Sequence, residues 1–268
     1  MTWLNEPLAT IGYCWRIERR DGVAIGLTAH DRDLEVDGFL YRAAPGMTPS
    51  AIRRGAGLDA DSMDVTGALT GAAISEADLL AGRWDGARIS LFAVDWTAPD
   101  EVVALGSGTI GAVETRDGTL TAELRGAAAA LDAPVVEMTS PECRAELGDK
   151  RCRVAMAGRR RFARVIAADG AVLTLDEEEP VPGGWAGGRV RWIGGANSGL
   201  NDGIAASAED VVTLRRAPRF EAVGALVEVS EGCDKSIATC AERFGNAANF
   251  RGEPYLPGID LLTRYPGG

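Results

Sequence analysis

The sequence predicts a mainly β protein, with two small antiparallel barrel or sandwich domains and a small loop-and-helix domain. Asp-Gly pairs recur between stretches of alternating residues, and Asp-Gly suits the type I′ turn of a two-residue β-hairpin. The chain has 34 glycines among its 268 residues, most of them in predicted turns, which is typical of many short strands. Strands do not alternate with long helical segments, so a parallel α/β fold is not expected.

Three Asp-Gly pairs predict hairpins because strand-like residues lie on both sides of the turn. Their turns are Asp21-Gly22, Asp117-Gly118 and Asp169-Gly170. The paired strands are expected at residues 14–18 and 23–28, residues 109–114 and 119–124, and residues 162–166 and 171–175. Two further pairs, Asp37-Gly38 and Asp202-Gly203, also predict turns.

Three short helices are predicted. Each begins after a serine, a favoured N-cap, and ends before a glycine, which is favoured just beyond a helix. Pro141 would occupy the first position of the second helix, where proline is well tolerated. The helices are expected after Ser75, Ser140 and Ser236 and end at Gly82, Gly148 and Gly245.

The composition narrows the range of functions. A formal net charge of −11 argues against direct nucleic-acid binding, which needs a basic surface. No run approaches the ~20 apolar residues of a membrane span, and residues 1–15 lack the pattern of a secretory signal. We therefore expect synthesis in the cytoplasm, where cysteine pairs favour metals over disulfides. No phosphate loop, zinc-protease or hydrolase motif is present, so we expect no enzyme activity.

Four of the five cysteines form two pairs. Cys143 and Cys152 have the spacing C-x8-C, and Cys233 and Cys240 have the spacing C-x6-C. Neither pair has the C-x2–4-C spacing of a common zinc finger. Spacing alone leaves four interpretations open: buried core thiols, one zinc ion, an iron–sulfur cluster, or disulfides. Cys14 lies in a predicted strand, and we interpret it as a core thiol.

Basic residues lie near both pairs. Arg144 and Arg151 are close to the first pair in sequence, and Lys235 and Arg243 are close to the second. A cluster with four thiolate ligands carries net negative charge, which nearby cations would offset. Cys143 would also lie in the first turn of a helix, where the helix dipole favours a thiolate.

The cysteine pairs divide the chain into three predicted domains. Residues 1–134 form an N-terminal β domain. Residues 135–158 and 228–268 carry the cysteines and together form a metal-binding domain. Residues 159–227 form a second β domain, inserted between the two halves of the metal-binding domain.

Several stretches carry a family pattern. Around the cysteines these are Ser140-Pro141-Glu142-Cys143-Arg144, Leu147-Gly148-Asp149-Lys150-Arg151-Cys152, Gly232-Cys233-Asp234-Lys235, Cys240-Ala241-Glu242-Arg243-Phe244-Gly245-Asn246 and Asn249-Phe250-Arg251-Gly252. Nearer the N-terminus they are Leu27-Thr28-Ala29-His30-Asp31-Arg32-Asp33 and Gly82-Arg83-Trp84-Asp85-Gly86. In these stretches the chain resembles the baseplate hub, or tail tip, family of long-tailed phages and gene transfer agents. The lambda-type tail tip protein is a relative, and the resemblance spans nearly the whole chain.

The resemblance implies a cofactor. The lambda-type relative holds a [4Fe–4S] cluster on cysteines of the same spacing, which implies that Cys143, Cys152, Cys233 and Cys240 are ligands here. The segment between the pairs is much longer in this chain, which fits an inserted β domain.

Other residues near the cysteines have expected packing roles. An apolar layer over the cluster is expected from Phe244, Phe250, Tyr255 and Leu256. Asn246 and Asn249 are expected to bond main-chain groups, and Trp185 is expected to pack rather than lie exposed.

The resemblance also implies a role. It is that of a homotrimeric structural hub in the virion tail tip, between a distal tail protein and a large tip or receptor-binding protein. A tail-associated cell-wall peptidase would be a further partner. Two alternatives remain. One is the same hub held by zinc, and the other is a redox-active or metal-stapled iron–sulfur enzyme or sensor unrelated to tails.

Overall fold

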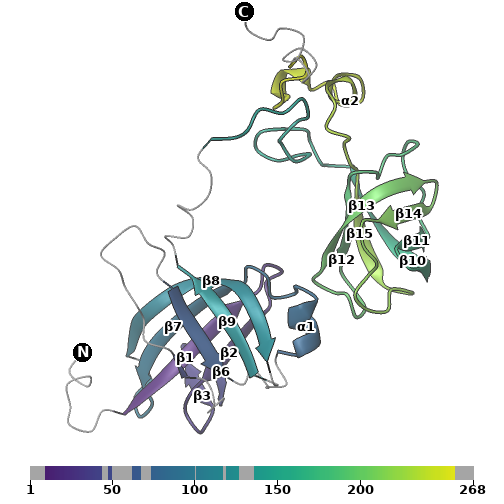
Figure 1. Ribbon diagram of the computed structural model, residues 1–268. Coiled ribbons are helices and arrows are strands. Elements are labelled where there is room, and N and C mark those ends of the chain that lie inside the picture. Colours follow the sequence, from purple (N-terminus) through teal and green to yellow (C-terminus); the bar gives the residue numbers. More distant parts are fainter. Residues whose placement is uncertain are drawn as a thin grey trace, which may run out of the picture. The chain divides into compact units, whose positions relative to one another are not determined.

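The computed structural model describes residues 10–43, 48–49, 62–67, 74–99, 101–116, 119–126 and 136–256. It is mainly β, as the sequence predicts, and its few helices are short (Figure 1). The chain divides into two compact units, Met1–Val135 and Val136–Gly268, and each is described by itself. Among the described residues, no helix has both the length and the apolar character needed to cross a membrane.

The first unit is built on one nine-stranded sheet with the order β3-β4-β2-β1-β7-β8-β9-β6-β5. Neighbouring strands are antiparallel except for the parallel pair β2 and β4. The strands are β1 (Ile11–Glu18), β2 (Ala24–Thr28), β3 (Leu34–Val36), β4 (Phe39–Ala43), β5 (Thr48–Pro49), β6 (Ser62–Gly67), β7 (Arg88–Asp95), β8 (Val102–Arg116) and β9 (Thr119–Arg125). One helix, α1 (Glu76–Leu80), begins at Ser75, whose side chain accepts a hydrogen bond from the Asp78 N–H as predicted.

The predicted hairpins of this unit are present. The strands β1 and β2 pair, and so do β8 and β9, although the turn residues 117–118 lie outside the described residues. Asp37 and Gly38 have positive φ angles of 51° and 71° and join Val36 directly to its partner Phe39, which is the predicted two-residue turn. The turn at Asp21-Gly22 is wider than predicted, because the pairing ends at Glu18 and Ala24.

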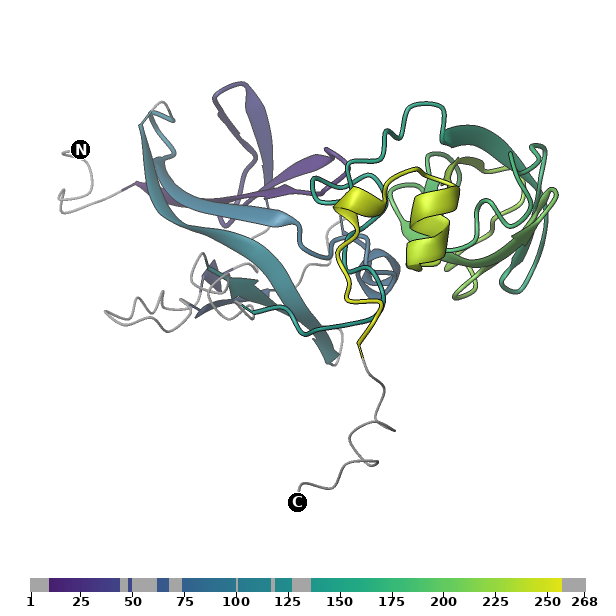
Figure 2. The same cartoon turned by 90° about the horizontal axis from the view of Figure 1, so that it is seen from above.

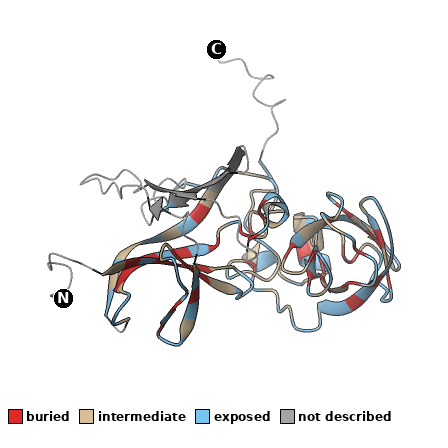
Figure 3. Ribbon diagram, turned by 90° about the horizontal axis from the view of Figure 1, so that it is seen from below, coloured by how far each residue is buried: buried red, intermediate tan, exposed pale blue. Residues whose placement is uncertain are grey.

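The middle parts of β1 and β7 have consecutive buried residues and are therefore buried on both faces (Figure 3). Trp15 and Leu91 pack in one apolar cluster, and Cys14 and Phe92 pack in another. Successive residues of a strand point to opposite faces, so one strand supplies both clusters. Cys14 is fully buried, which confirms it as a core thiol, and this burial raises its pKa.

The second unit contains a closed six-stranded barrel with the order β10-β11-β14-β13-β12-β15. Fully buried side chains such as Leu173, Trp192 and Ile204 fill the barrel, and Trp185 is buried as predicted. The elements are β10 (Arg160–Asp169), β11 (Val172–Leu175), β12 (Arg189–Trp192), β13 (Asn201–Ala208), β14 (Val211–Leu214), β15 (Leu226–Ser230), α2 (Ile237–Glu242) and the 3-10 helix η3 (Ala247–Asn249).

One predicted hairpin of the barrel is confirmed and one predicted turn is wrong. The strands β10 and β11 pair as expected. Asp202-Gly203, however, lies inside β13, where Gly203 pairs with Arg189 of β12. The Asp202 carboxylate accepts a hydrogen bond of 2.7 Å from the Trp192 indole N–H. Tertiary pairing therefore overrides the local turn preference of Asp-Gly at this position.

The barrel closes between β10 and β15, and this pairing positions the cysteines. Arg160 at the start of β10 pairs with Ser230 at the end of β15. The Glu231 N–H then donates to the Arg159 carbonyl at 3.0 Å. The chain consequently enters and leaves the barrel at one place, where the 136–158 segment lies beside α2 (Figure 1 and Figure 2).

The chain leaving the barrel passes very close to the loop before β12. A Cβ atom on Gly232 would lie 1.9 Å from the Ala186 carbonyl oxygen and 2.1 Å from the Gly188 nitrogen. Both contacts are with main-chain atoms, so neither can yield by a side-chain rotation.

We therefore expect Gly232→Ala to destabilise the second unit by at least about 1–3 kcal/mol, the typical cost of overpacking. Thermal unfolding of the purified variant measures this loss. Gly194→Ala is the matched control, because its Cβ would meet only ordinary contacts at 3.5 and 3.6 Å. Equal melting temperatures for the two variants would contradict the close passage.

Candidate metal centre

Four cysteines from two distant segments line one small cavity of the second unit. Cys143 and Cys152 reach it from one segment, and Cys233 and Cys240 reach it from the other. All four are free thiols, so the disulfide interpretation is not supported. The other residues that line the cavity are Ala145, Leu147, Val154, Ser236, Phe244, Asn246 and Asn249.

The free volume of this cavity is small, about 10 Å³, which is about the space of one water molecule. A metal–thiolate bond, however, is only about 2.3 Å long, much shorter than a van der Waals contact. Metal atoms bonded to the sulfurs therefore need less free space than an unbound ligand would.

Cys143 lies in a loop, and the predicted helix from Ser140 to Gly148 is wrong. The Cys143 N–H donates to the Lys235 carbonyl at 2.9 Å, and the Arg144 N–H donates to the Arg251 carbonyl at 3.0 Å. Both N–H groups therefore bond to other segments of the chain, and neither donates to the carbonyl four residues earlier, as an α-helix requires. The expectation that a helix dipole favours the Cys143 thiolate fails with this helix.

Cys152 is buried and held through its main chain on both sides. Its N–H donates to the Asp149 carboxylate at 2.6 Å, which lowers the pKa of Asp149. Its carbonyl accepts a hydrogen bond of 2.6 Å from the Asn246 side-chain amide, the role predicted for Asn246. The next residue, Arg153, has a positive φ of 62°, which is uncommon outside glycine and turns the chain sharply after the cysteine.

The second pair is positioned by α2, and this predicted helix is confirmed. Ser236 caps it by accepting from the Thr239 N–H. Gly245 follows with a φ of 58°, although the helix ends at Glu242, earlier than expected. Cys240 lies on the buried face of α2, and Cys233 precedes the cap.

Three of the four sulfurs face N–H donors. The Lys235 N–H is directed at the Cys233 Sγ at 3.3 Å, and the Arg251 N–H is directed at the Cys143 Sγ at 3.4 Å. The Asn246 amide is 3.7 Å from the Cys152 Sγ. Donors that point at a sulfur favour its charged form, so this arrangement suits thiolates better than neutral thiols.

Without a metal, the thiols oppose one another's ionisation. Burial raises the pKa of Cys240, and the charges of the other three cysteines raise it further. Burial also raises the pKa of Cys233, partly countered by the N–H and the charge of Lys235. Bound metal would replace the four protons and supply the missing positive charge.

Among the described residues, no group of three or more His, Cys, Asp or Glu side chains lies close enough together to hold one metal ion. The four thiols nevertheless line one cavity, and the formation of metal–thiolate bonds would draw their sulfurs together.

Comparison with known proteins places the chain in a family. Residues 1–155 match the family described as "Baseplate hub protein, N-terminal attachment domain". The chain belongs to this baseplate hub family. Residues 183–260, which include the second cysteine pair, match a second family described as "Phage conserved hypothetical protein BR0599".

A solved structure is similar to this hub protein along its length. It is a chain of the "Virion of native gene transfer agent (GTA) particle", with 36% sequence identity and a TM-score of 0.86. The similarity covers 99% of the hub protein and 94% of the virion chain. The search of curated proteins found no match.

Of the basic residues near the cysteines, the charge of Lys235 favours the Cys233 thiolate as the sequence suggested, but the arginines have other partners. The Arg144 guanidinium is bonded to the Glu253 carboxylate at 2.6 and 2.8 Å. This contact lowers the pKa of Glu253 to about 2. Arg151 forms an ion pair with Glu137. Several of these cations therefore fasten the cysteine-bearing loop to acidic neighbours and are not free to offset thiolate charge.

A buried ion pair network joins the barrel to α2. The Glu231 carboxylate accepts hydrogen bonds from Arg159 and Arg243, each at 2.7 Å. Glu231 is only 7% exposed. The two guanidinium groups lie 5.0 and 4.8 Å from the centre of the Phe244 ring, which itself lines the cysteine cavity. Sequence analysis missed Glu231, because a single acidic residue after a strand has no distinctive pattern.

The predicted apolar layer is present only in part. Phe244 lines the cavity. Tyr255 is 89% exposed and Leu256 is 43% exposed, so these two residues do not cover it. Their place is taken by residues of the first segment, including Leu147 and Val154.

Glu231→Gln should lower the free energy of unfolding of the second unit by roughly 3 kcal/mol, because it leaves two guanidinium groups without their carboxylate. Urea unfolding measures this change. Glu242→Gln is the control, since Glu242 is exposed on α2. A loss no larger than that of the control would mean that the network contributes little.

Proposed function

We propose that the chain is a structural hub of a phage-like tail tip, held together by a [4Fe–4S] cluster on Cys143, Cys152, Cys233 and Cys240. The observation that carries this proposal is the convergence of four free thiols from two distant segments on one cavity. Donors directed at three of the sulfurs support their role as thiolate ligands. Iron–sulfur clusters are typically held by four cysteine thiolates.

The proposed cluster acts as a cross-link. Metal–thiolate bonds would tie the segment of Cys143 and Cys152 to the segment of Cys233 and Cys240, on the two sides of the barrel entrance. The 136–158 segment contains no regular helix or strand, so it buries little apolar surface through regular packing. Metal ligation can supply the folding energy that a small loop-rich domain lacks.

The proposed place in the particle rests on family and structural similarity. The similar chain belongs to a gene transfer agent virion and matches nearly the full length of this protein. We infer a homotrimer between a distal tail protein and a large tip or receptor-binding protein, with a tail-associated cell-wall peptidase as a further partner. Membership of a baseplate family argues against an iron–sulfur enzyme or sensor unrelated to tails.

Protein purified without oxygen should be brown, with a broad absorption near ~400 nm and about four irons and four sulfides per chain. Any of the four cysteines changed to serine should lose most of this iron, because a hydroxyl is a poor ligand for the cluster. Cys14→Ala is the control, since Cys14 lies in the core of the first unit. A colourless protein with one zinc would leave the cross-link but exclude the cluster, and a metal-free protein would exclude both.

In a host that produces the particle, Cys233→Ser should leave the first unit folded but prevent tail assembly. The physical reason is that unit 1 has its own sheet and core, whereas the loops around Cys233 depend on the cross-link. Electron microscopy of lysates counts complete tails, and limited proteolysis reports the folding of the first unit. Normal numbers of tails from this variant would contradict a structural role for the cluster.

A further inference from the structure

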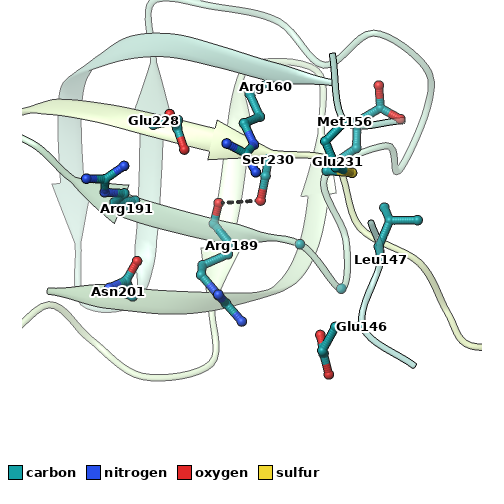
Figure 4. A pocket seen from close by; sticks show the side chains of 12 residues that line it. Glu146, Leu147, Met156, Arg160, Arg189, Arg191, Asn201, Glu228, Ser230 and Glu231 are labelled. Carbon is teal, nitrogen blue, oxygen red and sulfur yellow. Dashed lines mark hydrogen bonds between the residues drawn. The ribbon is translucent and has the colours of Figure 1, made fainter. Parts of the chain in front are cut away.

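A groove on the outside of the barrel carries unpaired positive charge. It has a volume of about 280 Å³ and lies between β10, β15 and β12 on one side and Glu146, Leu147 and Met156 on the other (Figure 4). Arg160, Arg189 and Arg191 line it and are exposed. We call these three residues the arginine groove.

The register of the strands holds the three arginines together. Ser230 of β15 pairs with Arg160 on one side and with Arg189 on the other. Arg191 lies two residues further along β12, on the same face, and pairs with Glu228. Alternate residues of a strand share one face, so the groove is fixed by rigid elements rather than by a loop.

The arginines of the groove outnumber the free carboxylates that line it. Within the part of the chain that the structure describes, none of the three forms an ion pair. Of the acidic side chains that line the groove, Glu231 is already bonded to Arg159 and Arg243, and Glu146 lies 3.6 Å from Lys235. Glu228 remains, so three guanidinium groups face one free carboxylate. This local excess is unusual in a chain with a net charge of −11.

The same barrel carries a matching acidic patch. Glu177 and Glu178 follow β11. Glu209 lies in the turn between β13 and β14, and it is held near them because its carbonyl accepts a hydrogen bond from the Glu179 N–H. Glu177, Glu178 and Glu209 are exposed, and no ion pair involves them among the described residues. We call these three residues the acidic lip.

The groove and the lip are separate patches of one barrel. The groove lies over β10, β15 and β12, whereas the lip lies after β11 and at the β13–β14 turn. None of the three lip glutamates lines the groove, and among the described residues none forms an ion pair with its arginines. Both patches are held on the same barrel, so the lip is available to the groove of a second copy.

We propose that the arginine groove binds the acidic lip of a second copy of this chain. Guanidinium groups recognise carboxylates through paired hydrogen bonds, and three arginines oppose three glutamates. Because the two patches differ, the contact is head-to-tail, and it closes into a ring when the rotation permits. This interface deepens the proposed function, because it rests on the inferred homotrimer and assigns it residues.

The proposed contact depends on charge, and this determines its test. Exposed ion pairs are weakened by salt. Self-association of the full-length protein, measured by sedimentation at low ionic strength, should therefore weaken in 0.5 M salt, on the order of tenfold or more by the screening of several pairs. Wild-type protein that stays monomeric at low salt and high concentration would overturn the proposal.

Charge reversal makes the test specific. A groove variant that carries both R189E and R191E should lose association, and so should a lip variant that carries both E177K and E178K. All four changes together should restore it, which also shows that the variants fold. Arg216→Glu with Arg219→Glu is the control, because both residues are exposed on the same barrel but do not line the groove.

The remaining outcomes separate this proposal from the proposed function. If the groove variant loses association but the lip variant does not, the groove has a different acidic occupant and the proposal is wrong. If every variant associates like the wild type, the interface lies elsewhere and the hub remains. Iron content measured on the same samples reports on the cluster independently.

Discussion

The pairing of β10 with β15 is the constraint on which the second unit depends. It closes the barrel, and it also forces the chain to enter and leave at one place, Arg160 beside Ser230. Two cysteine pairs that are far apart in sequence thereby come to line a single cavity. Loop closure over so many residues would be entropically costly for a flexible chain. Folding of the barrel closes this loop, so the two cysteine-bearing segments already start close together.

The charges of this unit are organised around the same point. Glu231 leaves β15 and joins Arg159 before β10 to Arg243 at the end of α2. Arg144 and Glu253 fasten the first cysteine loop to the C-terminal segment in the same manner. Such ion pairs are buried or partly buried, so salt screens them less than fully exposed pairs. The arginine groove, in contrast, lies on the outer face of the barrel.

The local signals of the sequence were most reliable where they did not compete with tertiary contacts. The caps at Ser75 and Ser236 formed as predicted, because each serine bonds an N–H of its own helix. The signal at Ser140 and Pro141 was equally good but failed, because the N–H groups of Cys143 and Arg144 bond to Lys235 and Arg251. The turn signal at Asp202-Gly203 failed for the same reason, since β12 pairs with those residues. Nothing in either local pattern reveals the presence of a distant competitor.

The sequence by itself determined the β class, most hairpins, the two capped helices and the identity of the four paired cysteines, because these follow from turn chemistry, capping and residue type. Only the tertiary structure decided that the four thiols share a cavity, which donors face them, and that Glu231 links barrel to helix. It also decided that Tyr255 lies exposed and that several nearby arginines are already paired. These features depend on contacts between residues that are far apart along the chain, and spacing along a sequence does not encode distance in space.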